Sequence, residues 1–404
     1  MLDLGKINDI MQNKKAMNAI CIGVLCSLSY LAVYYARNLL SAISPHMGKS
    51  DEFIGTLSSV YFAVYATGQL INGYLGNRIK AKYMISLGLF LAGIANLLLP
   101  VLLPLTEFGA IVSYGATGFF LSMIYGPMTK IVAENTELVY ATRCTLGYQF
   151  ASFIGAPMAG VMASIIVWQG VVYSCSAFLT GMAVVFFIVC TGFERKGIVS
   201  YNEFDRPKEE KKGGVSLLIK RGIIRFTVIS VVTGVIRTTV MFWMPTYFTN
   251  YLGFTAESSS RIFAVTTFII SFTTFIVIFI YEKLKRNMNL TILLMFTSAA
   301  LFFLLLYLVK EPYLNIAVMV IAIMSSAGAA TMMWSRYCPS LRDTGMVSGA
   351  TGYLDFISYM SAAASSKIFS NAVSTIGWGK LILVWAGLMI IGIIVSLPLK
   401  KQRG

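Results

Sequence analysis

The sequence predicts an all-α membrane protein with twelve transmembrane helices in two pseudo-symmetric six-helix bundles. Of its 404 residues, 57% are hydrophobic and only 12% are charged, a composition typical of membrane proteins and not of soluble enzymes. Apolar runs of about 20 residues, the length that crosses a bilayer as a helix, recur along the whole chain. They lie at approximately residues 20–44, 54–76, 83–104, 108–130, 145–167, 171–192, 223–249, 261–281, 289–309, 313–335, 345–369 and 379–398.

The basic residues give the expected orientation of these spans. The formal net charge is +15, but the lysines and arginines gather in alternate loops, which argues against a nucleic-acid partner. The intervening loops hold little beyond Lys49 and Lys310. This is the positive-inside pattern. We therefore expect both termini in the cytoplasm, an even number of spans, and a multi-pass protein of the cell inner (cytoplasmic) membrane with the lipid bilayer around it.

The long polar segment Glu194–Gly214 divides the chain near its middle. Its charges, proline and glycines are typical of a solvated linker. We expect a first bundle at residues 1–193, a cytoplasmic linker at 194–222 and a second bundle at 223–404. Residues 1–16 are expected to form a short surface helix. No pattern of a nucleophile with a base, or of metal ligands, occurs, so neither an enzyme nor a cofactor or metal is expected.

Each half carries one arginine inside an apolar span. Arg37 and Arg237 are each followed, eight residues later, by a proline, Pro45 and Pro245. The similarity continues downstream, where the serine pair 58–59 recurs at 259–260. Internal repeats of this kind are typical of secondary transporters, which hold the substrate between their two halves.

The free energy needed to place these arginines inside a membrane indicates that they have a functional role. An arginine near the bilayer centre costs roughly 2.5–3.5 kcal/mol, so it must face water, a counter-charge or a ligand. Its planar fork matches carboxylate and phosphate oxygens in a bidentate way. Arg37 and Arg237 in one cavity would form an anion site, with Tyr30 and Tyr34 on the same helical face as Arg37. In the alternative, each arginine only pairs with a nearby acid or with helix-end carbonyls.

The loop after the second span carries a recognisable motif. Gly73–Lys82 reads GYLGNRIKAK and resembles the short cytoplasmic loop of the major facilitator superfamily, with Asn77 where an aspartate is usual. Glycine permits close helix approach, and the basic cluster suits a cytoplasmic helix end. With twelve spans and a central linker, the resemblance implies the major facilitator fold.

Within that superfamily, the arginine motifs resemble those of the organophosphate:phosphate antiporter family, which includes glycerol-3-phosphate and hexose-phosphate transporters. Residues 30–38 are similar to its tyrosine-rich first helix, and Arg237 with residues 243–247 (WMPTY) is similar to its seventh helix. Residues 126–130 (GPMTK) are similar to the end of its fourth helix. The resemblance implies that Arg37 and Arg237 bind phosphate and that Tyr30, Tyr34 and Tyr65 line the cavity.

Two positions depart from that family. Ser152, in the fifth span beside the candidate Gln149, stands where glycerol-phosphate members have a histidine, and Gln69 stands where a lysine is frequent. This site therefore has fewer positive groups. A phosphate ester remains the first expectation, and a smaller or singly charged anion such as a carboxylate is a rival.

Asp355 is the one acid well inside a span of the second bundle. A buried carboxylate needs a partner or a proton. Asp355 either couples protons or orients substrate, with Tyr359 one turn further as another candidate binding residue, or it forms a structural ion pair with Arg237 or Lys367. Both readings stay open.

We therefore expect a secondary transporter that moves a small organic anion by alternating access, acting as a monomer. The coupling is expected to be exchange, with inorganic phosphate as one candidate counter-ion, or proton symport. The alternatives are a membrane sensor of the same fold that binds the anion without transporting it, and a proton-coupled carboxylate, drug or lipid permease.

Overall fold

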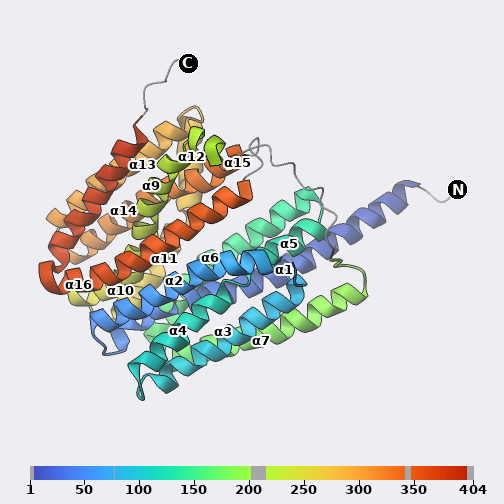
Figure 1. Ribbon diagram of the computed structural model, residues 1–404, viewed down its shortest axis with the longest axis horizontal. Coiled ribbons are helices and arrows are strands. Elements are labelled where there is room, and N and C mark those ends of the chain that lie inside the picture. Colours follow the sequence, from blue (N-terminus) through green and yellow to red (C-terminus); the bar gives the residue numbers. More distant parts are fainter. Residues whose placement is uncertain (1–3, 77, 202–214, 342–346, 398–404) are drawn as a thin grey trace. The chain divides into compact units, whose positions relative to one another are not determined.

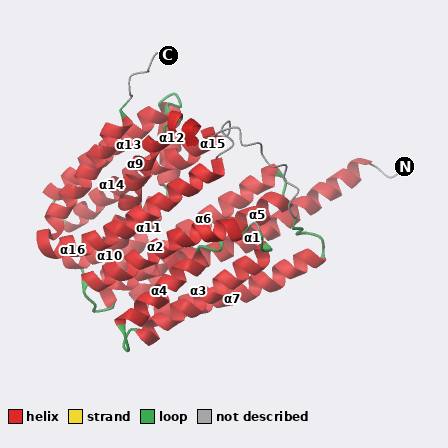
Figure 2. Cartoon of the chain, in the orientation of Figure 1, coloured by secondary structure: helices red, strands yellow, loops and turns green. Residues whose placement is uncertain are grey.

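The computed structural model describes residues 4–76, 78–201, 215–341 and 347–397 of the chain (Figure 1). Helices follow one another through these residues, and no strand occurs among them (Figure 2). The described residues belong to two compact units, Met1–Ile43 with Thr67–Asp205, and Ser44–Ala66 with Arg206–Gly404. We call them unit 1 and unit 2.

Unit 1 is a bundle of long helices. Its elements are α1 (Leu4–Ile43), residues 67–75 of α2 (Asp51–Leu75), α3 (Ala81–Leu102), α4 (Glu107–Leu121), α5 (Tyr125–Asn135), α6 (Leu138–Ile165) and α7 (Trp168–Arg195). The closest pairs are α1 with α6, α3 with α7 and α3 with α4. Small residues permit these approaches: a Cβ at Gly88 of α3 would lie 2.9 Å from the carbonyl oxygen of Phe120.

Unit 2 contains the rest of the helices. They are η1 (Ser44–His46), residues 51–66 of α2, α8 (Val215–Lys220), α9 (Ile223–Gly234), η2 (Val235–Val240), α10 (Met241–Asn250), α11 (Ala256–Ser271), α12 (Thr273–Lys283), α13 (Met288–Leu308), α14 (Pro312–Met332), η3 (Met333–Tyr337), α15 (Cys338–Ser340) and α16 (Val347–Ser396). Helix α16 packs against α9, η2 and α13, and α14 packs against α13.

The helices agree with the spans expected from hydropathy. Among the described residues, nine helical stretches are long and apolar enough to cross a membrane. The last, residues 349–396, covers two of the expected spans, because α16 changes direction at Gly377 (φ 74°, ψ 166°). The expected spans 54–76 and 145–167 correspond to α2 and α6. The expectation of an all-α membrane fold is confirmed.

One expectation about the chain's course differs from the structure, and a second lies largely outside the described residues. Residues 4–16 are helical as expected, but helix α1 runs without a break from Leu4 to Ile43, so the expectation that this helix is a short one of its own is wrong. The reason is that no proline occurs before Pro45 and no glycine occurs between Gly5 and Gly23, so nothing stops the helix near residue 16. The core of the expected linker, residues 202–214, lies outside the described residues, and the bundle limits at 193 and 223 stay a prediction.

The segment 44–66 packs on the second half of the chain within unit 2. Ser44 shares a hydrogen bond of 3.2 Å with Thr246, and Ser58 shares one with Ser366. A Cβ at Gly55 would lie 2.5 Å from the Cβ of Ser370, so only glycine allows α2 this close to α16. Helix α2 thus begins in one unit and ends in the other.

Candidate functional site

Arg37 lies in α1, seven residues after Tyr30 and three after Tyr34, on the face that the sequence indicates. It is half-buried, and its guanidinium carbon is 5.2 Å from the centre of the Tyr34 ring. This distance is within the range of a cation–π contact. Tyr35, one residue off this face, instead shares a hydrogen bond of 2.8 Å with Ser174 of α7.

Tyr30 and Tyr34 belong to a larger group of rings in unit 1. The Tyr30 ring centre lies 4.9 Å from that of Tyr34, 5.6 Å from that of Tyr125 and 5.8 Å from that of Tyr148. The rings of Tyr125 and Tyr148 lie 6.4 Å apart. These four residues, from α1, α5 and α6, are here called the tyrosine cluster. Tyr30 and Tyr148 are buried, whereas Tyr125 is 38% exposed.

Gly155 of α6 positions this cluster. A Cβ there would lie 2.4 Å from the Cβ of Tyr34 and 2.8 Å from its backbone carbon. Only glycine therefore lets α6 approach α1 at the level of Tyr34. This contact fixes the position along α1 and α6 at which the ring of Tyr148 meets that of Tyr30.

Arg237 lies in unit 2, inside the π-helical turn η2, between α9 and α10. Single π-helical turns within α-helices are rare and occur frequently at functional sites. Arg237 is half-buried, and it forms no hydrogen bond or ion pair with any residue in the described part of the chain. The neighbouring Thr238 is buried, and its hydroxyl has no hydrogen-bond partner among the described residues either.

Side-chain contacts hold η2 against α16. The hydroxyl of Thr239 shares a hydrogen bond of 2.7 Å with Ser365 and donates one of 3.1 Å to the carbonyl of Ala362. A Cβ at Gly234 would lie 2.5 Å from the carbonyl oxygen of Ser358. The helix that carries Arg237 is therefore fixed to α16, the helix that carries Asp355 and Tyr359.

Tyr65 and Tyr359 meet in unit 2. Both are buried, and their ring centres lie 4.9 Å apart in an edge-to-face arrangement. Tyr61 stacks on Tyr65 with a centre distance of 6.1 Å. Asp355 is half-buried one turn before Tyr359 in α16, so both lie on one helical face. Tyr65, Tyr359 and Asp355 thus form one group.

The pairing of Asp355 with Lys367 is not found. Lys367 instead forms an ion pair of 3.2 Å with Glu52 and donates a hydrogen bond of 2.9 Å to Thr56. Twelve residues of helix separate Asp355 from Lys367, a rise of about 18 Å that no side chains bridge. The pairing of Asp355 with Lys367, one of the two ion pairs considered for it, is therefore wrong.

The structure describes the remaining candidate residues only in part. Gln69 is half-buried in the part of α2 that belongs to unit 1. The side chains of Gln149 and Ser152 in α6 lie outside the described residues, as does Asn77 of the loop motif. Within that loop, Lys80 forms an ion pair of 3.0 Å with Glu194, in the last turn of α7, and Lys82 pairs with the same carboxylate. The basic cluster therefore does lie at helix ends.

Sequence reasoning missed Tyr125 and Tyr148. Both are next to residues of the motifs that it used, since Tyr125 precedes Gly126 and Tyr148 precedes Gln149. Helical spacing relates residues of one helix only, and these tyrosines reach Tyr30 from other helices. The one feature of the sequence that could have indicated Tyr125 and Tyr148 is that each is an aromatic residue next to a residue already singled out.

The arrangement suits anion recognition. In unit 1, a guanidinium lies against the tyrosine cluster, and tyrosine hydroxyls can donate hydrogen bonds to an oxyanion. In unit 2, a second guanidinium stands in a π-helical turn beside a group with one carboxylate. Among the described residues, no three His, Cys, Asp or Glu side chains are close enough to hold a metal ion.

Comparison with known families decides the class of protein. The sequence model described as Major Facilitator Superfamily matches residues 22–366. The chain belongs to the Major Facilitator Superfamily. It is accordingly a multi-pass membrane transporter and not an enzyme. The superfamily expected from the loop motif is confirmed.

One curated relative is similar over part of its length. The proton-coupled antiporter flippase LtaA of Staphylococcus saprophyticus subsp. saprophyticus is 27% identical over 226 residues. The match spans 56% of this chain and 52% of the flippase, about half of each.

Solved transporter structures share the fold. A D-xylose–proton symporter covers 93% of this chain with a TM-score of 0.71, and 96% of its own chain is matched at 14% identity. A POT family transporter in complex with 5-aminolevulinic acid gives a TM-score of 0.72, 14% identity, and coverage of 93% and 94%. A bacterial homologue of the human lysosomal transporter Spinster gives 0.69 at 12% identity, with coverage of 94% and 96%. At these identities the similarity concerns the fold alone.

Proposed function

We propose that this transporter carries a small organic anion, first of all a phosphate ester such as a sugar phosphate or glycerol phosphate, and binds it with Arg37 and Arg237. The observation that supports the proposal best is the setting of Arg37, whose guanidinium carbon lies 5.2 Å from the Tyr34 ring. A guanidinium stays charged, and its fork matches two oxygens of a phosphate or carboxylate. Tyrosine hydroxyls nearby add neutral donors.

Arg237 supplies the second positive charge. In the described part of the chain no carboxylate pairs with it, although an arginine inside a membrane costs roughly 2.5–3.5 kcal/mol. A bound anion would offset that cost. The resemblance of both arginine motifs to the organophosphate:phosphate antiporter family supports the same substrate class.

The mechanism we propose is alternating access. The anion binds to one arginine from each half and neutralises both, which lowers the barrier to switching. In this mechanism, the positive charges of the two arginines repel each other when no anion is bound, which disfavours closure of the two halves around the empty site. Obligatory exchange follows from that asymmetry, whereas proton symport would use Asp355, the half-buried carboxylate beside Tyr359.

The proposed setting is the cytoplasmic membrane, with both termini in the cytoplasm, as the basic loops indicate. The proposed functional unit is a monomer of two bundles, residues 1–193 and 223–404, joined by the segment 194–222.

Uptake by proteoliposomes tests the arginine pair. Labelled hexose phosphate, glycerol phosphate and phosphate are offered to wild type, Arg37→Lys and Arg237→Lys. We expect each variant to lose at least ~10-fold in uptake, because lysine keeps the charge and loses the bidentate fork. Arg261→Lys is the matched control, since Arg261 is exposed on α11. Undiminished uptake by both arginine variants would contradict the proposal.

A separate measurement decides the role of Asp355. Accumulation driven by an imposed pH gradient is compared between wild type and Asp355→Asn. Loss of gradient-driven accumulation with retained exchange supports proton coupling through this carboxylate. Unchanged accumulation removes Asp355 from the coupling mechanism.

A second candidate function is proton-coupled movement of a lipid or drug, which the match to a proton-coupled antiporter flippase favours. Thermal shift of the purified protein with phosphate esters, carboxylates and lipid phosphates separates the two. Stabilisation by lipid phosphates alone favours the flippase function. Stabilisation by small anions without any flux would indicate the sensor.

A further inference from the structure

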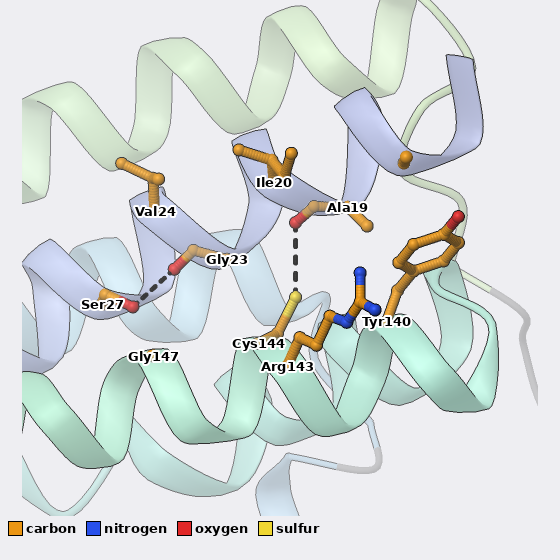
Figure 3. Close-up of a pocket in the computed structure, with 10 residues that line it drawn as sticks. Ala19, Ile20, Gly23, Val24, Ser27, Tyr140, Arg143, Cys144 and Gly147 are labelled. Atoms are coloured by element: carbon orange, nitrogen blue, oxygen red, sulfur yellow. Dashed lines mark hydrogen bonds between the residues drawn. The ribbon is translucent and has the colours of Figure 1, made fainter. Parts of the chain in front are cut away.

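A groove opens between the first half of α1 and the first half of α6, both in unit 1 (Figure 3). Its volume is about 240 Å³. Its walls come mainly from small and aliphatic residues, which include Ala16, Ala19, Ile20, Gly23, Val24 and Gly147. We call it the α1–α6 groove.

The hydroxyl of Ser27 and the thiol of Cys144, both in the walls, already have hydrogen-bond partners. Ser27 donates a hydrogen bond of 2.7 Å to the carbonyl of Gly23, and Cys144 donates one of 3.3 Å to the carbonyl of Ala19 (Figure 3). The Ser27 hydroxyl is therefore satisfied within α1, and the Cys144 thiol is satisfied by a bond from α6 to α1. They offer little to a ligand, and the inner part of the groove is in effect apolar.

Arg143 is different. Its side chain lies at one end of the groove beside the ring of Tyr140, 5.8 Å from the ring centre (Figure 3). It is exposed and forms no ion pair with any residue that the structure describes. Glu137, the nearest acid along the chain, pairs with Lys15 at 2.9 Å. The groove thus combines an apolar wall with one uncompensated guanidinium.

Tyr30 and Tyr148 of the tyrosine cluster follow the groove residues along the same two helices. Tyr148 follows Gly147 of the groove wall, and Tyr30 lies three residues after Ser27. The rings of Tyr30 and Tyr148 are 5.8 Å apart. Beyond them Gly155 packs on Tyr34, so Arg143 lies about 18 Å along α6 from the level of Tyr34.

We infer that the α1–α6 groove is a second anion site, at which the transported anion binds with its charged group on Arg143 before or after it occupies the tyrosine cluster. This inference rests on the proposed function. A positive charge at the edge of a low-dielectric groove concentrates anions and speeds their capture. The groove is smaller than drug-sized pockets of about 300–1,000 Å³, which favours a small anion with an apolar part over a two-chain lipid.

A cysteine at the groove tests the site directly. Val24 is 54% exposed and lines the groove, so Val24→Cys places a thiol there. The full-length variant, in nanodiscs of phosphatidylcholine, is alkylated with N-ethylmaleimide, and the labelled peptide is quantified by mass spectrometry. Phenyl phosphate is the probe. We expect it to slow labelling of the cysteine at position 24.

Three backgrounds separate this site from the proposed central one. With Arg143→Gln, protection should require at least ~10-fold more phenyl phosphate, and Arg143→Lys should restore part of it because the charge returns. With Arg37→Lys, protection should persist. Protection that is lost with Arg37→Lys and retained with Arg143→Gln would overturn the groove site and leave the proposed function standing.

Two further outcomes complete the test. Protection by phosphatidylglycerol in the nanodisc, but not by phenyl phosphate, would make the groove a lipid site and overturn the inference. Arg143→Gln should also raise KM for uptake with little change in kcat, since the site acts in capture. If the protein transports no anion while Arg143-dependent protection persists, the proposed function fails and the groove remains an anion site.

Discussion

Arg37 and Tyr34 lie about one helical turn apart in α1, and the guanidinium carbon of Arg37 is 5.2 Å from the centre of the Tyr34 ring. A cation over an aromatic ring is stabilised by the ring's quadrupole. The same ring packs against Tyr30 with a centre distance of 4.9 Å, and the Cβ and backbone of Tyr34 lie against Gly155 of α6. Tyr34 thus connects the charged group to the packing of two helices.

Two substitutions of Tyr34 distinguish the contribution of its ring from that of its hydroxyl. Tyr34→Leu removes both, and we expect substrate affinity to fall by ~2- to 30-fold, which corresponds to a cation–π energy of about 0.5–2 kcal/mol. Tyr34→Phe keeps the ring, so its loss should be smaller. Competition binding with a phosphate ester measures both. Equal losses in the two variants would show that the hydroxyl, and not the ring, is what matters.

Tyr125 and Tyr148 should respond differently to the same change. Tyr125 is 38% exposed, so Tyr125→Leu is expected to weaken binding while the melting temperature changes little. Tyr148 is only 2% exposed, so Tyr148→Leu should also destabilise the protein by about 1–3 kcal/mol. Thermal unfolding and ligand binding are measured on the same preparations. Binding unchanged in Tyr125→Leu would exclude its ring from the site.

Gly155 should tolerate no side chain. A Cβ there would lie 2.4 Å from the Cβ of Tyr34, so Gly155→Ala must displace α1 or α6, at an expected cost of about 1–3 kcal/mol. Gly192→Ala is the matched control, because a Cβ at that helical glycine meets nothing within 4 Å. Alanine there should be neutral or slightly stabilising. Similar melting temperatures for the two variants would contradict the close packing.

The hydroxyl of Thr239 should contribute more to stability and transport than that of a threonine whose hydrogen bonds stay within its own helix. Thr239→Val removes the hydrogen bonds to Ser365 and Ala362 that hold η2 on α16, and we expect a loss of about 1–3 kcal/mol with lower transport. Thr249→Val is the control, since the Thr249 hydroxyl donates only to carbonyls of its own helix α10, those of Pro245 and Thr246. Differential scanning fluorimetry and uptake measure the pair. An equal effect of both changes would refute the role of this contact.

Much of the candidate site was predictable because it lies along single helices. The stripe of Tyr30, Tyr34 and Arg37 follows from helical spacing, and Asp355 with Tyr359 follows in the same way. The helices themselves follow from apolar runs of the length that a bilayer requires. The partner of Lys367 was not predictable, since Glu52 lies 315 positions away in the chain.

By itself, the sequence determined the helical membrane fold, the repeated arginine in each half and the tyrosine face of α1, because each depends on hydropathy and on local spacing. The tertiary structure alone decided that Tyr125 and Tyr148 join Tyr30, that Arg237 stands in a π-helical turn, and that an apolar groove ends at Arg143. Such contacts depend on how helices pack, and packing is set by glycines and by neighbours far apart in the chain.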